Sequence, residues 1–164
     1  LGGAGGEGRN GVWLAGQGLS VAGFDLSQTA VERAQVLAAK SGVGINAYVS
    51  DWEGWDWSQS FDLVVAVFVQ FMGPEARVRQ FETLREAVRP GGRLVLHGYT
   101  PEQVEFGTGG PPYPENMYTP ELLNDAFGDW RVLRLAAYER EVQEGRGHSG
   151  HSALIDLVAE KPAI

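Results

Sequence analysis

The sequence predicts a doubly wound α/β fold, in which a mostly parallel sheet ends in a C-terminal antiparallel hairpin. Short apolar runs bounded by turn residues alternate along the chain with segments whose apolar residues recur at helical spacing. Residues 60–71, SFDLVVAVFVQF, are apolar on both faces, which is typical of a central parallel strand covered by helices on each side. The last two apolar runs are joined by the glycine-rich segment QEGRGHSG, which predicts an antiparallel pair.

The first half of the chain shows the alternation in order. After a glycine-rich start, residues 9–18 predict a short helix that ends at Gly16 and Gly18, and residues 19–27 predict a strand that runs into a turn. Ser27 is the expected N-cap of a helix in the segment 28–42, and Gly42, the last residue of this segment, lies past the end of the helix. Residues 44–52 predict the next strand.

The second half continues from the central strand. Pro74 suits the first turn of a helix that the segment RPGG ends, and residues 93–99 predict another strand. The expected core face of that helix consists of Val78, Phe81, Leu84 and Val88. A short helix over 120–127 then precedes strands over 130–142 and 151–162. Such alternation implies right-handed crossovers and a parallel sheet.

The segment FGTGGPPYPENM, residues 106–117, follows the strand at 93–99 and is punctuated by glycine and proline. Ligands of open α/β sheets sit outside the carboxyl ends of the strands, so this segment lies where a lid would lie. An ordinary surface connection is an equally good interpretation.

Composition limits the class of protein. A chain of 164 residues predicts one domain over residues 1–164, and the absence of cysteine excludes disulfides and thiolate ligands and suits a cytoplasmic location. The formal charge of −8 opposes binding to a nucleic-acid backbone. The longest apolar run, residues 61–72, falls short of the ~20 residues that span a bilayer. We therefore expect a small-molecule partner, with no nucleic acid, membrane or metal; the sequence predicts no oligomeric state.

The opening LGGAGGEGRN lets backbone N–H groups approach a ligand closely, although a frayed terminus would have the same composition. Gly3, Gly5 and Gly8 satisfy G-x-G-x-x-G, and Asp25 follows at the distance of a ribose-binding acid, which is the pattern of a nicotinamide oxidoreductase. Glu7 and Asp51, however, would place acids beside a pyrophosphate. A cationic sulfonium cofactor without phosphate removes this conflict, so the oxidoreductase stays the weaker hypothesis.

Six segments, in their order and spacing, resemble class I S-adenosylmethionine-dependent methyltransferases, and within them the tellurite-resistance and thiopurine methyltransferase-like group. These segments are GEGRN, GFDLSQTAVERAQ, SDW, FDLVVAVFVQF, RPGGRLVL and YTPEQVEFGTGGPPYPENMYTPELL. The resemblance implies a Rossmann-like fold that lacks its N-terminal part. It also implies methyl transfer to a thiol, oxygen, nitrogen or metalloid oxyanion of a small acceptor.

The resemblance also implies which residues hold S-adenosylmethionine. Asp25 would bind the ribose hydroxyls, and Asp51 with Trp52 would bind adenine; a carboxylate can accept from both kinds of donor. The remaining cofactor-binding residues are Gly5, Gly6, Gly8, Leu26 and Val67. Structural alternatives are a cap for the next helix at Asp25, a turn at Asp51 and a core edge for Trp52, Trp55 and Trp57.

The sequence departs from the family's pattern before the loop. The first loop glycine of the family falls on Ala4, and the acid that precedes it falls on Gly2. Either the chain is a fragment or cofactor binding is weakened. A non-catalytic, methyltransferase-like binding domain therefore remains an alternative to the enzyme.

A histidine is the natural base for acceptors that must lose a proton. If the strand at 130–142 runs parallel to its sheet, the turn after it lies on the ligand edge, which favours His148 as the catalytic residue. The resemblance implies a functional histidine in this late turn, followed by arginine; here Ser149 follows, and Arg146 could substitute. An exposed turn residue is the alternative. His97 is expected to be packed and hydrogen-bonded, and His151 to begin the last strand.

Overall fold

The computed structural model describes residues 1–3, 8–143 and 149–164. The chain divides into two compact units. Unit 1 contains Leu1–Gln59 with Val65–Val67, and unit 2 contains Ser60–Val64 with Phe68–Ile164. Within the described residues, none of the helices has the length and apolar character needed to cross a membrane.

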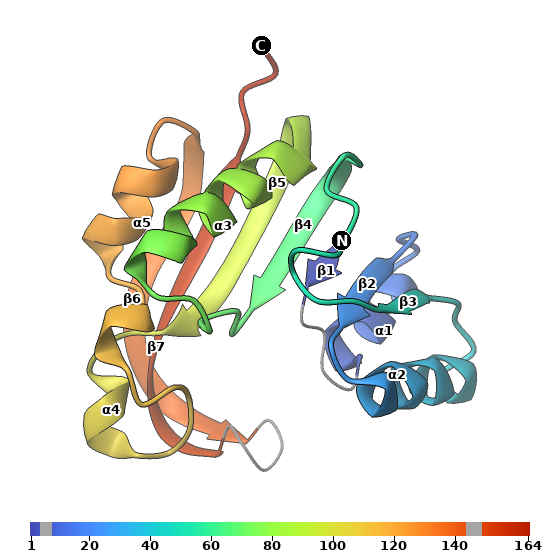
Figure 1. The fold of residues 1–164 in the computed structure, drawn as a ribbon, viewed down its shortest axis with the longest axis horizontal. Helices are drawn as coiled ribbons and strands as arrows, with labels where there is room; N and C mark the ends of the chain where they lie inside the picture. Colours follow the sequence, from blue (N-terminus) through green and yellow to red (C-terminus); the bar gives the residue numbers. More distant parts are fainter. Residues whose placement is uncertain (4–7, 144–148) are drawn as a thin grey trace. The chain divides into compact units, whose positions relative to one another are not determined.

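Unit 1 consists of parallel strands and two helices (Figure 1). The strands lie in the order β3-β2-β1, and β1 also pairs in parallel with the last residues of β4. The elements are β1 (Gly2–Gly3), α1 (Arg9–Gly16), β2 (Ala22–Asp25), α2 (Gln28–Lys40), β3 (Asn46–Val49) and the end of β4 (Phe61–Val67). Because these strands run in one direction, their carboxyl ends meet at one edge.

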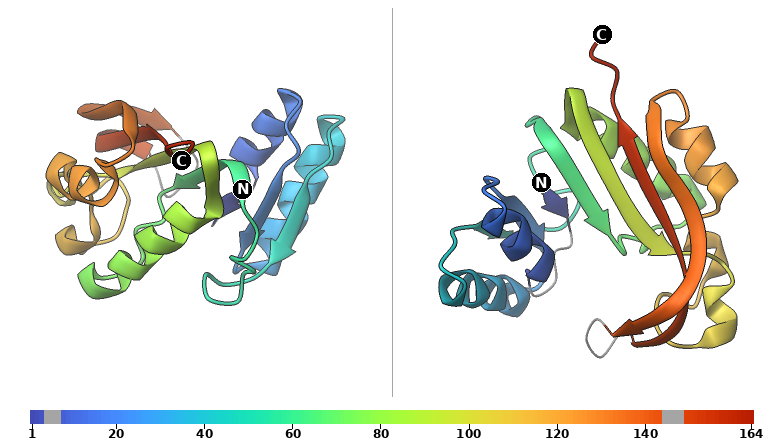
Figure 2. Two further views of the ribbon diagram at one scale, coloured as in Figure 1. Left: turned by 90° about the horizontal axis from the view of Figure 1, so that it is seen from above. Right: turned by 180° about the vertical axis from the view of Figure 1, so that it is seen from behind.

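Unit 2 contains the strand order β4-β5-β7-β6, with β7 antiparallel to both of its neighbours. β6 therefore runs in the same direction as β5. This parallel direction is the condition under which the sequence favoured His148 as the catalytic residue. The elements are α3 (Pro74–Ala87), β5 (Val88–Tyr99), α4 (Gln103–Phe106), η1 (Pro114–Asn116), α5 (Pro120–Phe127), β6 (Arg131–Gln143) and β7 (Ser149–Glu160). Within this unit α3 and α5 lie on one face of the strands, and in the rear view none of the helices formed by its described residues covers the other face (Figures 1 and 2).

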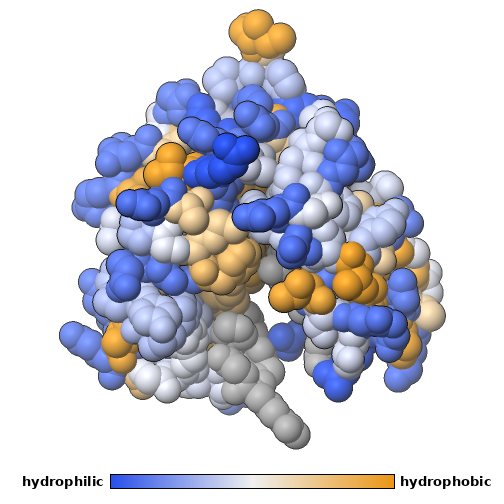
Figure 3. All heavy atoms as spheres, in the orientation of Figure 1, coloured by the Kyte–Doolittle hydropathy of each residue, from blue (hydrophilic) through white to orange (hydrophobic). Residues whose placement is uncertain are grey.

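The predicted fold class is confirmed, and the local signals for helix ends are also correct. The Ala30 amide donates to the Ser27 hydroxyl at 3.2 Å, which makes Ser27 the N-cap of α2. Pro74 begins α3, and Gly42 adopts φ 69° after α2. The face drawn in Figure 3 consists mainly of hydrophilic residues and residues of intermediate hydropathy, with scattered apolar groups.

Three strand boundaries differ from the prediction for identifiable reasons. β4 ends at Val67 because Phe68 adopts φ 54°, which breaks the extended backbone. β5 begins at Val88, because the segment RPGG continues the pairing: the Gly91 amide donates to the Lys161 carbonyl at 3.0 Å. Gly2–Gly3 form β1, whereas the sequence placed them in the glycine loop.

The predicted core face of α3 is wrong at Val78, whose side chain is 61% exposed. The buried residues of α3 are Arg77, Gln80, Phe81, Leu84 and Ala87. Two polar side chains thus lie where an apolar stripe was expected. Both need partners inside the protein, because burying an unpaired polar group costs free energy.

The start of α1 packs directly against α2. Gly8 adopts φ 83° at the N-cap of α1, and its carbonyl accepts from the Val12 amide at 2.9 Å. A Cβ added at Gly8 would lie 2.5 Å from the Cβ of Ala34 in α2. The third glycine of the loop pattern therefore has a structural reason that needs no ligand.

Gly8→Ala should lower the free energy of unfolding by at least about 2 kcal/mol, because it adds left-handed strain to an overlap with Ala34. Gly16→Ala is the matched control. Gly16 lies in the same helix, has no positive φ, and its Cβ would meet nothing within 4 Å. Urea denaturation of both variants measures the difference, and equal stability would contradict this packing.

Candidate functional site

The candidate site lies at the carboxyl edge of the strands in unit 1. Asp25 is the last residue of β2 and is paired with Val49, the last residue of β3. The Ser50 amide donates to the Asp25 carbonyl at 3.0 Å, so Asp51 follows at the same edge. Val67, the last residue of β4, ends there too, because Ala66 is paired with Gly3 of β1. The structure thus brings together three strand-end residues that the sequence predicted.

Asp25 fixes the turn into α2. Its Oδ1 accepts a hydrogen bond from the Ser27 amide at 2.8 Å, which is the structural alternative weighed for this residue. A carboxylate has two oxygens and about four acceptor positions, so this contact is compatible with further donors. The ribose-binding role stays a prediction.

Asp51 likewise holds a turn while keeping acceptor capacity. Its Oδ1 accepts from the Gly54 amide at 2.6 Å, and a Cβ on Gly54 would lie 2.8 Å from that oxygen. Within residues 1–3, 8–143 and 149–164, Oδ2 of Asp51 has no hydrogen-bond partner. This oxygen is therefore suited to a donor such as an amino group.

The two apolar residues predicted at the site differ in exposure. Leu26, directly after Asp25, is 74% exposed, whereas Trp52 is only 8% exposed. Trp52 lies in an aromatic cluster of Phe24, Tyr48, Trp52, Trp55 and Trp57, and its ring centroid is 4.6 Å from that of Trp57. The Trp57 indole N–H donates to the Trp52 carbonyl at 2.6 Å. The tryptophans thus stabilise the segment after β3, and the adenine contact of Trp52 stays a prediction.

Several predicted residues lie outside the described residues. These are Gly5 and Gly6 of the glycine loop, together with His148 and Arg146 of the late turn. Their roles remain predictions from the sequence.

His97 is packed and hydrogen-bonded, as expected. Its Nδ1 lies 2.6 Å from Oδ1 of Asp156, and the same oxygen accepts from the Tyr138 hydroxyl at 2.9 Å. The other oxygen of Asp156, Oδ2, accepts from Nε of Arg134 at 3.0 Å. Burial raises the pKa of Asp156, but these donors outweigh burial and hold the pKa below its usual value. The result is a polar network across β5, β7 and β6.

His151 lies within β7, and its Nε2 is 3.2 Å from Oε2 of Glu139 on β6. Its ring also meets the edge of Phe106 at 4.8 Å between centroids. Both histidines of the described residues are therefore engaged with carboxylates.

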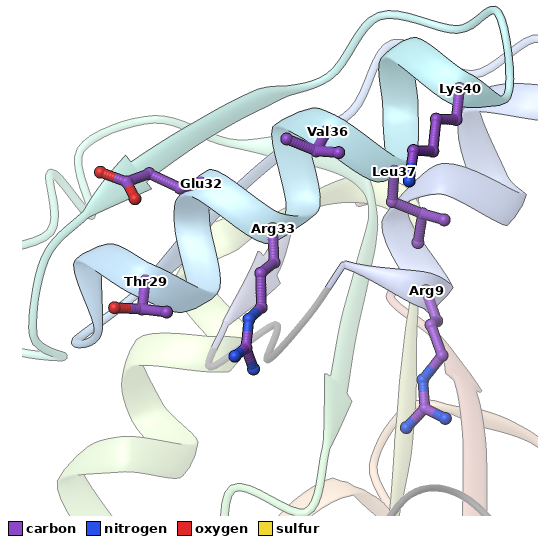
Figure 4. A pocket seen from close by; sticks show the side chains of 7 residues that line it. All are labelled: Arg9, Thr29, Glu32, Arg33, Val36, Leu37 and Lys40. Atoms are coloured by element: carbon purple, nitrogen blue, oxygen red, sulfur yellow. The ribbon is translucent and has the colours of Figure 1, made fainter.

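A basic depression of about 730 Å³ lies on α1 and α2 of unit 1 (Figure 4). It is lined by Arg9, Thr29, Glu32, Arg33, Val36, Leu37 and Lys40. The guanidinium groups of Arg9 and Arg33 extend to the same side in Figure 4. Asp25 and Asp51 are not among the residues that line it.

Sequence reasoning missed the role of Gln70 in unit 2. The Gln70 amide pairs with the backbone of Tyr99 in both directions, each at 2.8 Å, and so extends the pairing of β5 past the end of β4. A Cβ on Gly98 would lie 2.8 Å from Gln70 Oε1, which explains the glycine beside it. The available signal was a single amide inside the apolar run FVQFM.

Two kinds of comparison identify similar proteins. A family model described as "Methyltransferase domain" matches residues 2–92, which is more than half of the chain. No curated protein matches the sequence.

Solved structures share the fold at low identity. A methyltransferase from Methanosarcina mazei, described as SAM-dependent, is 18% identical with a TM-score of 0.77, and the alignment covers 100% of this chain and 92% of that chain. TehB from Haemophilus influenzae is 17% identical with a TM-score of 0.74, and 98% of this chain spans 57% of that chain. A SAH-bound magnesium protoporphyrin IX methyltransferase from Synechocystis is 18% identical with a TM-score of 0.72, covering 98% and 72%.

Trp57→Phe should lower the free energy of unfolding by about 1 kcal/mol, because it removes the hydrogen bond to the Trp52 carbonyl and keeps an aromatic ring. Trp13→Phe is the control, since Trp13 is 64% exposed on α1. Chemical denaturation measures both. An effect no larger than that of the control would mean that the aromatic cluster does not fix this segment.

Asp156→Asn should destabilise the protein at pH 7 by about 1–2 kcal/mol, because the carboxylate accepts three hydrogen bonds. The folded-state pKa of Asp156 is lowered, so its stabilisation is complete above the unfolded pKa of about 3.9 and is lost as the pH falls through the folded pKa. Unfolding curves measured from pH 7 to pH 2 should therefore converge for the two proteins. Asp62→Asn, at a side chain 83% exposed, should change stability much less.

Proposed function

The chain belongs to the methyltransferase domain family, and from this premise we propose that residues 1–164 form one domain that transfers a methyl group to a small-molecule acceptor. The cofactor is S-adenosylmethionine. When bound, it would supply a methyl group on a sulfonium: the acceptor atom would attack the methyl carbon in line, and the sulfur would leave as the thioether of S-adenosylhomocysteine. The residues of this chain bind, orient and shield the reactants.

The observation that best supports this proposal is that Asp25 and Asp51 lie at the same edge of the parallel strands. The hydrogen bond from the Ser50 amide to the Asp25 carbonyl fixes this arrangement. Two carboxylates favour a ligand that carries hydroxyl and amino donors and no phosphate. We assign the ribose hydroxyls to Asp25 and the adenine amino group to Oδ2 of Asp51. Leu26, exposed beside them, supplies an apolar contact, and Trp52, Val67 and the glycines Gly5, Gly6 and Gly8 complete the proposed site.

For acceptors that must lose a proton, we assign the base to His148. A thiolate or a metalloid oxyanion arrives as a nucleophile and needs no base. The likeness of the fold to TehB supports the tellurite-resistance-like group within the family. The acceptor atom is accordingly a sulfur, oxygen, nitrogen or metalloid.

A second candidate is a methyltransferase-like binding domain without catalysis. It is favoured by Gly2, which lies in β1 at the position where the resemblance expects an acid. Turnover separates this candidate from the enzyme, and binding of NADH would support the weaker oxidoreductase hypothesis.

The test is calorimetric titration with S-adenosylhomocysteine and, separately, with NADH. We expect S-adenosylhomocysteine alone to bind. Asp25→Asn and Asp51→Asn each keep an Oδ1 acceptor for the turn and lose the charge, so each should weaken binding about 10- to 100-fold. Asp125→Asn, on the exposed face of α5, is the matched control and should bind as the wild type does.

Binding that survives in both site variants would refute the assignment of the two carboxylates. Binding of neither ligand to the wild type would refute the cofactor site in this chain. Binding without methyl transfer to thiols, phenols, amines and tellurite would favour the non-catalytic domain.

A further inference from the structure

Arg77 is a buried cation without a counter-ion. Arg77 is 8% exposed, and its Nη1 donates to the Glu115 carbonyl at 2.7 Å. Across the described ranges of the chain, no carboxylate forms an ion pair with it. The acids nearest in the sequence, Glu75 and Glu82, are exposed, and so is Glu115, whose carbonyl accepts its hydrogen bond. Burying a charge is costly unless it is paired.

A second polar group beside Arg77 also lacks a partner. Tyr118 is completely buried, and its hydroxyl has no hydrogen-bond partner among the described residues. Its ring packs on Phe81, one helical turn after Arg77, with 5.6 Å between centroids. Burial raises the pKa of Tyr118, and the Arg77 cation opposes this shift without cancelling it. The hydroxyl is therefore protonated and able to donate.

In unit 2 this pair lies near the carboxyl ends of β4 and β5. Arg77 lies in the first turn of the 14-residue helix α3, which begins after the segment that follows β4. Tyr118 follows η1, and its amide donates to the Tyr99 carbonyl at the end of β5 at 3.1 Å. Open α/β sheets bind ligands outside the carboxyl ends of their strands. The positive end of the α3 dipole adds to the charge of Arg77.

We propose that Arg77 and the Tyr118 hydroxyl bind an oxyanion group, a carboxylate or a free oxyanion, of the methyl acceptor. A guanidinium presents donors in a planar fork that matches a carboxylate. Among the described residues, Arg77 donates one side-chain hydrogen bond, from Nη1 to the Glu115 carbonyl. The anion would neutralise the buried cation and give the tyrosine an acceptor. The acceptor is thus an anionic small molecule; calling it the acceptor rests on the proposed function, whereas the oxyanion site does not.

The test compares benzoate with benzamide, which has nearly the same shape and no charge. Each is titrated at constant ionic strength, with and without S-adenosylhomocysteine, and followed by the amide resonances of Arg77 and Tyr118. We expect benzoate to bind at least about tenfold more tightly than benzamide. Sodium tellurite is then titrated as a competitor of benzoate. Competition supports a site that also accepts a free oxyanion, and benzoate binding without competition supports a site for organic carboxylates.

Arg77→Met should abolish the preference for benzoate, and Tyr118→Phe, which keeps the buried ring, should reduce it a few-fold. Arg79→Met, on the exposed side of α3, is the control and should keep the full preference. An arginine that only anchors Glu115 would change stability and leave the ratio of the two affinities unchanged. If Arg77→Met fails to fold, Tyr118→Phe provides the readout, because it should reduce the preference a few-fold while keeping the buried ring.

Equal binding of benzoate and benzamide to the wild type would overturn the proposal, and so would a preference that survives in the Arg77 and Tyr118 variants. The titrations without S-adenosylhomocysteine test the oxyanion site independently of the proposed methyltransferase function. An Arg77-dependent preference in a protein that fails to bind S-adenosylhomocysteine would retain the oxyanion site and refute the methyltransferase. Binding of S-adenosylhomocysteine without any preference for benzoate over benzamide would refute the oxyanion site and leave the proposed function standing.

Discussion

Parallel pairing of β1, β2 and β3 is the constraint on which the candidate site depends. Parallel strands end at the same edge, so residues separated by tens of positions in the chain meet there without any direct attraction. The Ser50 amide and the Asp25 carbonyl extend this pairing by one bond, at 3.0 Å, and thereby fix where Asp51 follows. Two like charges at one edge are tolerated because each carboxylate accepts a backbone N–H, from Ser27 and from Gly54.

The same carboxylates combine a structural task with the proposed binding task. One oxygen of each residue holds a turn, which orients the side chain before any ligand arrives and lowers the entropy that binding would lose. A structural role in a turn does not exclude the proposed binding role at Asp25 or Asp51, because a carboxylate has two oxygens and several acceptor positions.

Unit 2 uses buried polar side chains at the ends of its parallel strands. Gln70 completes the backbone pairing of Tyr99 with both halves of its amide, and the amide of Gln80 donates to the Val69 carbonyl at 3.1 Å. Among the described residues, Oε1 of Gln80 and the hydroxyl of Tyr118 are both buried without a hydrogen-bond partner. What distinguishes the proposed site is the charge of Arg77, for which hydrogen bonding to one carbonyl is no counter-ion.

The sequence alone determined the fold class, the helix signals at Ser27 and Pro74, and the order of the strand-end residues, because hydrophobic periodicity and turn chemistry are local properties. It also assigned the acids to a cofactor through a resemblance carried by short segments. It failed at Val78 and Arg77, since a helical stripe read from apolar residues cannot reveal which face a neighbouring loop will cover. The tertiary structure decided that Arg77 lies buried beside Tyr118, 41 positions later in the chain, because partners of buried polar groups are set by packing between distant segments.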